Sequence, residues 1–283
     1  MIVKNEKLTI AVVGAGGKMG TRITNNLVKE NVLVKFCEKS KPGIQSINER
    51  GYEVSDTENA VKESDVVVLA VPDTLIGTIS EEIVPNMKSG AMLITLDPAA
   101  AYADQIKLRD DVNFVVTHPC HPSVFAEHTT PEEHADVFGG VASTQDIVIA
   151  LHKGEESCMK DAEDICISMF EPVKKCHRIT VEHMAILEPT AAEVVTGTMA
   201  VVIKEALEEV VKKGVPREAA ESFILGHIQI CLAVALKGTN PFSDACEVAI
   251  DYGKEKILAS DWKDVFTQES LNEVLQEMLE IKK

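Results

Sequence analysis

Two histidines, His118 and His121, lie in the segment 117–123, whose sequence is THPCHPS. An imidazole at neutral pH is suited to general acid or base catalysis and to metal binding. The two prolines stiffen the backbone that carries both rings. A rigid loop whose histidines are hydrogen-bonded for structural reasons would have the same spacing. Cys120 between them is better interpreted as a small buried thiol than as a third ligand.

Two carboxylates, Glu188 and Glu193, stand at the head of a long apolar segment. A carboxylate in apolar surroundings is costly unless it is paired or bound. Pro189 favours the first helical turn, so we expect Glu188 to lie just outside a helix, where it could share a cleft with Glu193. The alternative is that both acids simply favour the positive end of the helix dipole. His183 either begins this helix or belongs to the site.

A glycine-rich loop follows the apolar run 8–13, LTIAVV, and has the sequence GAGGKMG at 14–20. It is a variant of the G-x-G-x-x-G pattern that joins a strand to a helix and lets the backbone approach a pyrophosphate. A tight turn without a ligand is the alternative. Glu38 ends the next apolar run, 18 residues after Gly20, where a carboxylate can bond a ribose 2′-hydroxyl and repel a 2′-phosphate. This predicts NAD rather than NADP, although Lys39 and Lys41 are close.

Short apolar runs at 66–71, 92–96 and 113–117 alternate with segments long enough for crossover helices. The pattern predicts an α/β fold with a doubly wound parallel sheet, the Rossmann arrangement. Ligands of such sheets bind beyond the carboxyl ends of the strands. By position the candidates are therefore Pro72, Asp73, Asp97, His118 and His121, although Asp97 before Pro98 is equally typical of a turn.

The pattern changes after the strand-like run 146–151, because most later segments have helical periodicity. We predict a dinucleotide-binding Rossmann domain at 1–153 and an all-helical substrate and dimerisation domain at 154–283. The helices expected at 189–213 and 222–236 are apolar on several sides and need cover. A homodimer would supply it. Alternatively, the helices bury each other and the back of the first domain.

The composition, with 45% hydrophobic residues among 283, indicates a globular protein. The net charge of −17 argues against nucleic acid or an anionic membrane as partner. Seven scattered cysteines without a C-x-x-C pair favour free thiols in a reducing cytoplasm. We find no signal peptide and no uninterrupted apolar stretch of membrane length, so a cytoplasmic enzyme with a small-molecule substrate is expected.

The glycine loop, Glu38, the Val-Pro-Asp at 71–73, the His-Pro-Cys-His-Pro segment and the Leu-Glu-Pro at 187–189 together resemble the phosphogluconate-dehydrogenase-like oxidoreductases, particularly the branch of the D-apionate oxidoisomerases. The resemblance implies NAD at 14–20 and Glu38, and substrate or a divalent metal near His118, His121, Glu188 and Glu193. It departs at one point. The phosphogluconate and β-hydroxyacid dehydrogenases carry a lysine on the interdomain helix, where this chain has EPTAAE at 188–193, so a lysine-based mechanism is not expected.

These residues lead to a hypothesis: an NAD-dependent oxidoreductase acts on a hydroxyl of a small polyhydroxy carboxylic (sugar) acid. His121 or Glu193 would take the hydroxyl proton, and a divalent metal on His118 and Glu188 would polarise oxygen during oxidation and isomerisation. The predicted cofactor-binding residues are Gly14, Gly16, Gly17, Lys18, Met19, Gly20, Glu38, Pro72 and Asp73. The alternatives are an NAD(P)-dependent hydroxyacid dehydrogenase without isomerisation and a non-catalytic NAD-sensing dimer.

Overall fold

The computed structural model describes residues 7–281, and its contacts divide the chain into two compact units. The first takes in the described residues up to Ile186 together with those from Asn272 onward, and the second is Leu187–Leu271. The sequence suggested a division at 153/154 instead. The first unit therefore contains two helices, Met159–Phe170 and Val181–Ala185, the strand Val173–Arg178 and most of the helix Gln268–Met278, which the sequence pattern assigned to the helical domain.

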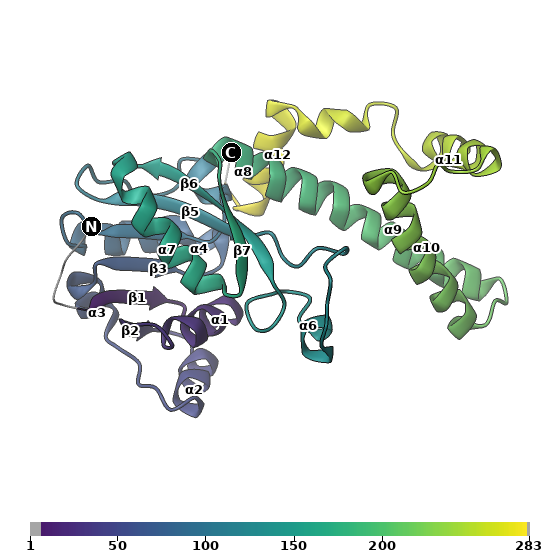
Figure 1. Cartoon of the computed structure of the whole chain (residues 1–283). Coiled ribbons are helices and arrows are strands. Elements are labelled where there is room, and N and C mark those ends of the chain that lie inside the picture. Colours follow the sequence, from purple (N-terminus) through teal and green to yellow (C-terminus); the bar gives the residue numbers. More distant parts are fainter. Residues whose placement is uncertain (1–6, 282–283) are drawn as a thin grey trace. The chain divides into compact units, whose positions relative to one another are not determined.

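The first unit is built on one seven-stranded sheet in the order β2-β1-β3-β4-β5-β6-β7 (Figure 1). The strands from β1 to β5 pair in parallel, β6 runs antiparallel to β5, and β7 is parallel to β6. The Rossmann prediction is confirmed, although the sheet is not parallel throughout. The strands are β1 (Leu8–Val13), β2 (Val32–Cys37), β3 (Val66–Leu69), β4 (Met92–Thr95), β5 (Asn113–Pro119), β6 (Gln145–Lys153) and β7 (Val173–Arg178).

Helices cover both faces of this sheet, and for that reason the central strands are mostly apolar, with β3 apolar at every position. On one face, Ile10 and Val12 of β1 belong to the same buried cluster as Ile23 and Leu27 of α1. Helix α7 contributes to that cluster too, and α1 and α7 contact each other. The helices of this unit are α1 (Lys18–Leu27), α2 (Lys41–Glu49), α3 (Thr57–Glu63), α4 (Asp73–Ile83), α5 (Ala99–Tyr102), α6 (Pro131–Ala135), α7 (Met159–Phe170) and α8 (Val181–Ala185).

Strand β7 is the element that the sequence pattern missed. It lies at the edge of the sheet and pairs only with β6 among the described strands. Its sequence VKKCHR lacks the apolar run of a central strand, because an edge strand with charged side chains is protected from pairing with other chains. The expectation that nearly everything after about residue 150 is helical is therefore wrong for this stretch.

The second unit is helical, as expected from its sequence. Helices α9 and α10 end next to Gly214 and Gly238, both in the left-handed region, and Ser243 caps α11 by accepting from the Cys246 amide at 3.3 Å. The elements after α8 are the π-helix Ile186–Gly197, α9 (Thr198–Lys212), α10 (Arg217–Lys237), α11 (Asp244–Ile257), a 3₁₀ turn at Trp262–Phe266 and α12 (Gln268–Met278).

Two helical stretches among the described residues, Val181–Lys212 and Arg217–Lys237, are long and apolar enough to cross a membrane. From the sequence we expected no uninterrupted apolar stretch of membrane length. Core helices of soluble proteins pass the same test of length and composition, so this finding by itself places neither helix in a membrane. It does show that the second unit has much apolar surface to cover.

We expect Gly20→Ala to destabilise the first unit. A Cβ at this position would lie 2.1 Å from the carbonyl oxygen of Gly14, so α1 would have to move away from the loop. Overpacking of this kind costs about 1–3 kcal/mol, and thermal unfolding followed by circular dichroism should show a lowered melting temperature. Gly253→Ala in α11 is the control, because a Cβ there meets nothing within 4 Å. An equal melting temperature for Gly20→Ala and the parent chain would contradict the packing argument.

Candidate active site

The glycine loop packs so closely on its neighbours that side chains are excluded at several positions. Gly14 has φ +85°, and a Cβ on it would lie 2.2 Å from the carbonyl oxygen of Ala70, at the end of β3. A Cβ on Gly16 would lie 2.3 Å from the Gly43 carbonyl oxygen, in α2. The loop thus holds the ends of β1 and β3 and the start of α2 together, and no residue but glycine fits there.

Glu38 lies at the end of β2 with its carboxylate already oriented. One oxygen accepts from the Gly16 amide at 3.1 Å, and the other accepts from the amides of Lys39 and Ser40 at 2.9 Å each. A Cβ on Gly43 would lie 2.5 Å from the Glu38 carboxyl carbon, so this glycine makes room for the acid. The carboxylate of Glu38 is therefore tied to the loop that would hold a pyrophosphate.

Glu38 and the glycine loop line a cavity of about 400 Å³ at the carboxyl ends of the strands. Of the predicted cofactor residues, Gly14, Gly17, Glu38 and Pro72 line it. Gly17 is the N-cap of α1 and forms no side-chain cap, so the amides of the first turn have no capping acceptor of that kind. A helix N-terminus of this type is suited to a phosphate group.

The remaining predicted cofactor residues lie around this cavity without lining it. Lys18, Met19 and Gly20 form the first turn of α1, and Lys18 places its ammonium 3.8 Å from the centre of the Phe138 ring. Asp73 begins α4 and lines a separate cavity of about 170 Å³. Their assignment to the cofactor stays a prediction.

Asp97 and His118 come together at the ends of the neighbouring strands β4 and β5. A carboxylate oxygen of Asp97 and a ring nitrogen of His118 lie within 4.8 Å of each other. His118 Nδ1 lies 2.8 Å from the Pro119 carbonyl oxygen, which identifies Nδ1 as the protonated nitrogen and leaves the lone pair on Nε2. Burial lowers the pKa of His118 to about 4. The ring is therefore neutral at pH 7, as a metal ligand must be.

Asp97 combines a turn-forming role with its position in the site. Its carboxylate accepts from the Ala99 amide at 2.7 Å, as the turn interpretation expects. The side chain is nevertheless buried, with 9% of the residue exposed, and it raises the pKa of Asp73. The residues alone did not select Asp97 over a turn former. The available signal was its place at the end of a strand next to the one that carries His118.

His121 lies beside His118, but it does not line the cavity formed by the glycine loop and Glu38. The two rings are perpendicular, with centroids 6.0 Å apart. His121 has φ +60°, and its Nδ1 lies 2.9 Å from the Phe138 carbonyl oxygen. It lines a cavity of about 930 Å³ together with residues from β6 and β7. Cys120 is exposed there, so the expectation of a buried thiol is wrong.

Glu188 and Glu193 both lie inside the π-helix Ile186–Gly197, so the expectation that Glu188 lies outside a helix is wrong. In an α-helix, residues five apart point about 140° away from each other. A π-helix bonds residue i to i+5 and so brings such residues nearer to one face. The Thr196 hydroxyl donates to the Ala191 carbonyl at 2.9 Å, with the same spacing of five. The altered helix thus places the two carboxylates in neighbouring positions of successive turns.

The models of two protein families match the chain. Residues 126–279 match the C-terminal domain of phosphogluconate dehydrogenase (decarboxylating), and residues 3–134 match the NADPH-binding domain of acetohydroxy acid isomeroreductase. Among curated relatives, a D-apionate oxidoisomerase from Pectobacterium atrosepticum is 48% identical, over 98% of this chain and 97% of that protein. A D-apionate oxidoisomerase from Blautia hydrogenotrophica is 45% identical, over 96% and 97% of the two chains.

A solved structure from Cupriavidus necator, described as a semialdehyde dehydrogenase NAD-binding protein in complex with calcium and NAD, superposes with a TM-score of 0.93. It is 41% identical and covers 96% of this chain and all of the other. A Rossmann sheet with this glycine loop and acidic residue, joined to a helical unit, defines an NAD-dependent oxidoreductase. The chain belongs to the phosphogluconate-dehydrogenase-like oxidoreductases, in the branch of the D-apionate oxidoisomerases. The resemblance stated from the sequence is thereby confirmed.

Asp73→Asn should raise stability at neutral pH. Burial, followed by the charge of Asp97, raises the pKa of Asp73 from 3.8 to about 6. Between these pH values the folded chain holds a proton that the unfolded chain has released, so stability falls as pH rises through this window. Above pH 6 the full cost of the buried charge remains, and the asparagine removes it. Melting temperatures should therefore favour Asp73→Asn at pH 8 and converge near pH 4. A constant difference across that range would contradict the assignment.

Proposed function

We propose that the chain oxidises a hydroxyl group of a small polyhydroxy carboxylic acid with NAD and couples this oxidation to isomerisation, with D-apionate as the first substrate to test. The observation that carries the proposal is that ligand atoms of Asp97 and His118 lie within 4.8 Å of each other, at the edge of the sheet where the glycine loop also ends. The names of relatives 45% and 48% identical over nearly the whole chain support the choice of substrate.

We further propose that Asp97, His118 and Glu188 hold a divalent metal. A buried carboxylate beside a neutral imidazole whose Nδ1 is fixed by a backbone carbonyl fits such a group. Glu188, whose carboxylate is an oxygen ligand, is the third residue of this proposal. The relative from Cupriavidus necator contains calcium together with NAD. A bound metal would act as a Lewis acid on the substrate oxygens.

The oxidation removes a hydride, for which NAD is the acceptor, and a hydroxyl proton. We assign the proton to His121 Nε2. Its Nδ1 lies 2.9 Å from the Phe138 carbonyl, so Nδ1 carries the hydrogen and Nε2 is the basic nitrogen. Glu193 is the second candidate base, because the π-helix brings it toward the side of Glu188. Variants of each residue, assayed as a function of pH, distinguish the two.

The assay for this function combines NAD reduction with product analysis. With D-apionate and NAD we expect NADH together with a rearranged keto acid, whereas an oxidised but unrearranged acid would identify a simple hydroxyacid dehydrogenase. A non-catalytic sensor would bind NADH and turn over none of the sugar acids.

Glu188→Gln and Asp97→Asn should each reduce kcat about 100-fold or more while NADH binding persists, because they remove metal ligands and leave the dinucleotide cavity intact. Chelation by EDTA should lower activity reversibly. Glu182→Gln, an exposed acid in the first turn of α8, is the control. Full activity of Glu188→Gln, or indifference to EDTA, would disprove the metal proposal.

We also propose that the second unit pairs with its copy in a homodimer. Large apolar side chains are exposed on its helices, and stable interfaces bury about 1,600 Å² in total. The net charge of −17 disfavours an anionic membrane as the alternative cover. The exposed side chains include Val201, Phe223, Leu225, Ile230, Leu236, Val248, Tyr252 and Ile257.

The double substitution Phe223→Asp and Ile230→Asp should shift the chain from dimer to monomer, since each residue is more than half exposed and lies on α10. Light scattering coupled to size exclusion at micromolar concentration measures the mass. Thr239→Asp, in the turn after α10, adds the same group outside the helices and should leave the dimer intact. A monomeric parent chain would refute the proposal.

A further inference from the structure

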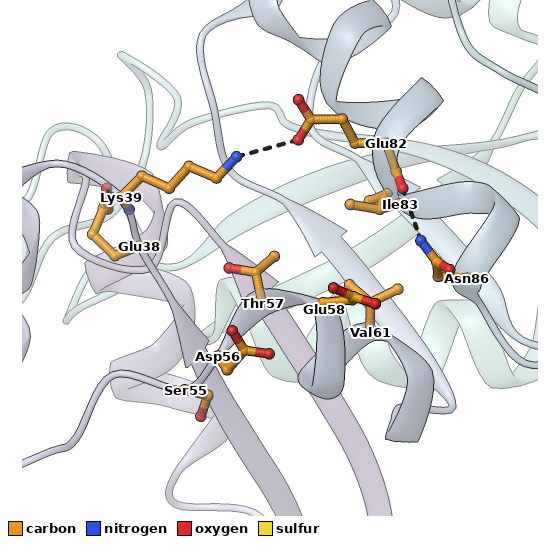
Figure 2. A pocket seen from close by; sticks show the side chains of 10 residues that line it. All are labelled: Glu38, Lys39, Ser55, Asp56, Thr57, Glu58, Val61, Glu82, Ile83 and Asn86. Atoms are coloured by element: carbon orange, nitrogen blue, oxygen red, sulfur yellow. Dashed lines mark hydrogen bonds and ion pairs between the residues drawn. The ribbon is translucent and has the colours of Figure 1, made fainter.

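An ion pair lies in the lining of the glycine-loop cavity, next to Glu38. The Lys39 ammonium, directly after β2, lies 3.2 Å from a carboxylate oxygen of Glu82, near the end of α4. Figure 2 shows the pair from the side of an adjoining cavity of about 460 Å³. Both residues line that cavity as well as the cavity of the glycine loop. The pair therefore lies where the two spaces meet.

Acidic residues outnumber basic ones among the described residues that line the two cavities. Among the described residues that line the two cavities, Lys39 carries the only full positive charge. The acids that line them are Glu38, Asp56, Glu58 and Glu82. A phosphate monoester carries a charge of about −1.5 to −2 at pH 7. Its binding in such surroundings would require a cation, and Lys39 is the one within the lining.

The carboxylates of Glu38 and Glu82 bind different groups at and near Lys39. The Glu38 carboxylate is held by backbone amides, including that of Lys39 itself, and leaves the ammonium unengaged by that acid. Glu82 binds the ammonium. One acid is therefore held at the glycine loop by backbone amides, while the other pairs with the nearest cation. The two effects act in the same direction, against a 2′-phosphate.

We propose that Glu82 is a specificity-determining residue that favours NAD over NADP by neutralising Lys39. The inference rests on NAD as the cofactor of this chain. The family model that matches residues 3–134 describes an NADPH-binding domain, so this fold also accommodates the phosphorylated cofactor. Lys39 would be available to the 2′-phosphate in this chain if Glu82 did not hold it.

The size of the effect follows from exposure. The Lys39 and Glu82 side chains are 78% and 57% exposed, and exposed ion pairs are weak. A lysine bonded to a phosphate forms a stronger, charge-assisted interaction. Release of Lys39 should therefore change the preference by about fivefold at most, and Glu38 remains in place to oppose a 2′-phosphate.

The test is equilibrium titration of NADH and NADPH, followed by their fluorescence, which needs no substrate. In Glu82→Gln, the ratio of the NADPH to the NADH dissociation constant should fall by about two- to fivefold. The double variant Lys39→Ala with Glu82→Gln should lose this gain, because no ammonium remains to bind the phosphate. Glu63→Gln is the control for net charge: it removes the same charge from an exposed glutamate that pairs with the half-buried Lys35 and lines neither cavity.

Three results would overturn the inference. An unchanged ratio in Glu82→Gln would show that the pair does not matter. A similar fall in Glu63→Gln, or in the double variant, would show that net charge acts without Lys39. Absence of NADH binding by the parent chain would overturn the cofactor assignment as well, whereas NADH binding without sugar-acid turnover would contradict only the proposed reaction.

Discussion

The close approach of three backbone segments at the glycine loop is the constraint on which the rest of the site depends. Gly14 lies against the end of β3, Gly16 against α2, and Gly20 against Gly14 itself. Because these contacts leave no room for a Cβ, the end of β1 and the start of α1 are held at one edge of the sheet. Glu38 is then tied to the same loop through the Gly16 amide. Backbone packing thus fixes the loop and the carboxylate that we predict to bind the cofactor.

The chemistry beside this loop uses buried polar groups that cost stability. Burial keeps His118 neutral, with a pKa of about 4, and raises the pKa of Asp73 to about 6. Groups shifted in this way cluster at functional sites, because a site needs protonation states that water alone would not favour. Asp97 connects the two: it lies within 4.8 Å of His118, and its charge contributes to the shift of Asp73. The ionisable groups at the carboxyl ends of β3, β4 and β5 therefore lie close enough together to influence one another's charge.

Only part of the candidate site could be predicted from the sequence. Local patterns identified the glycine loop, Glu38 and His118, because each lies next to an apolar run whose period defines its strand. Asp97 was not selected, since its importance depends on β4 and β5 being neighbours in the sheet. Strand β7 escaped notice because its polar sequence reflects an edge position. These failures have one cause: the pattern of a segment does not show which segments lie beside it.

The sequence by itself determined the fold class, the glycine-rich loop, the acid after β2 and the family, because strands, turns and glycine spacing depend on contiguous residues. Only the tertiary structure decided the antiparallel direction of β6, the partner of His118, the ion pair between Lys39 and Glu82, and the π-helical turn that carries Glu188 and Glu193. The physical reason is the distance along the chain. Lys39 and Glu82 are 43 residues apart, and their contact exists only once β2 and β3, which precede them, have taken their places on either side of β1.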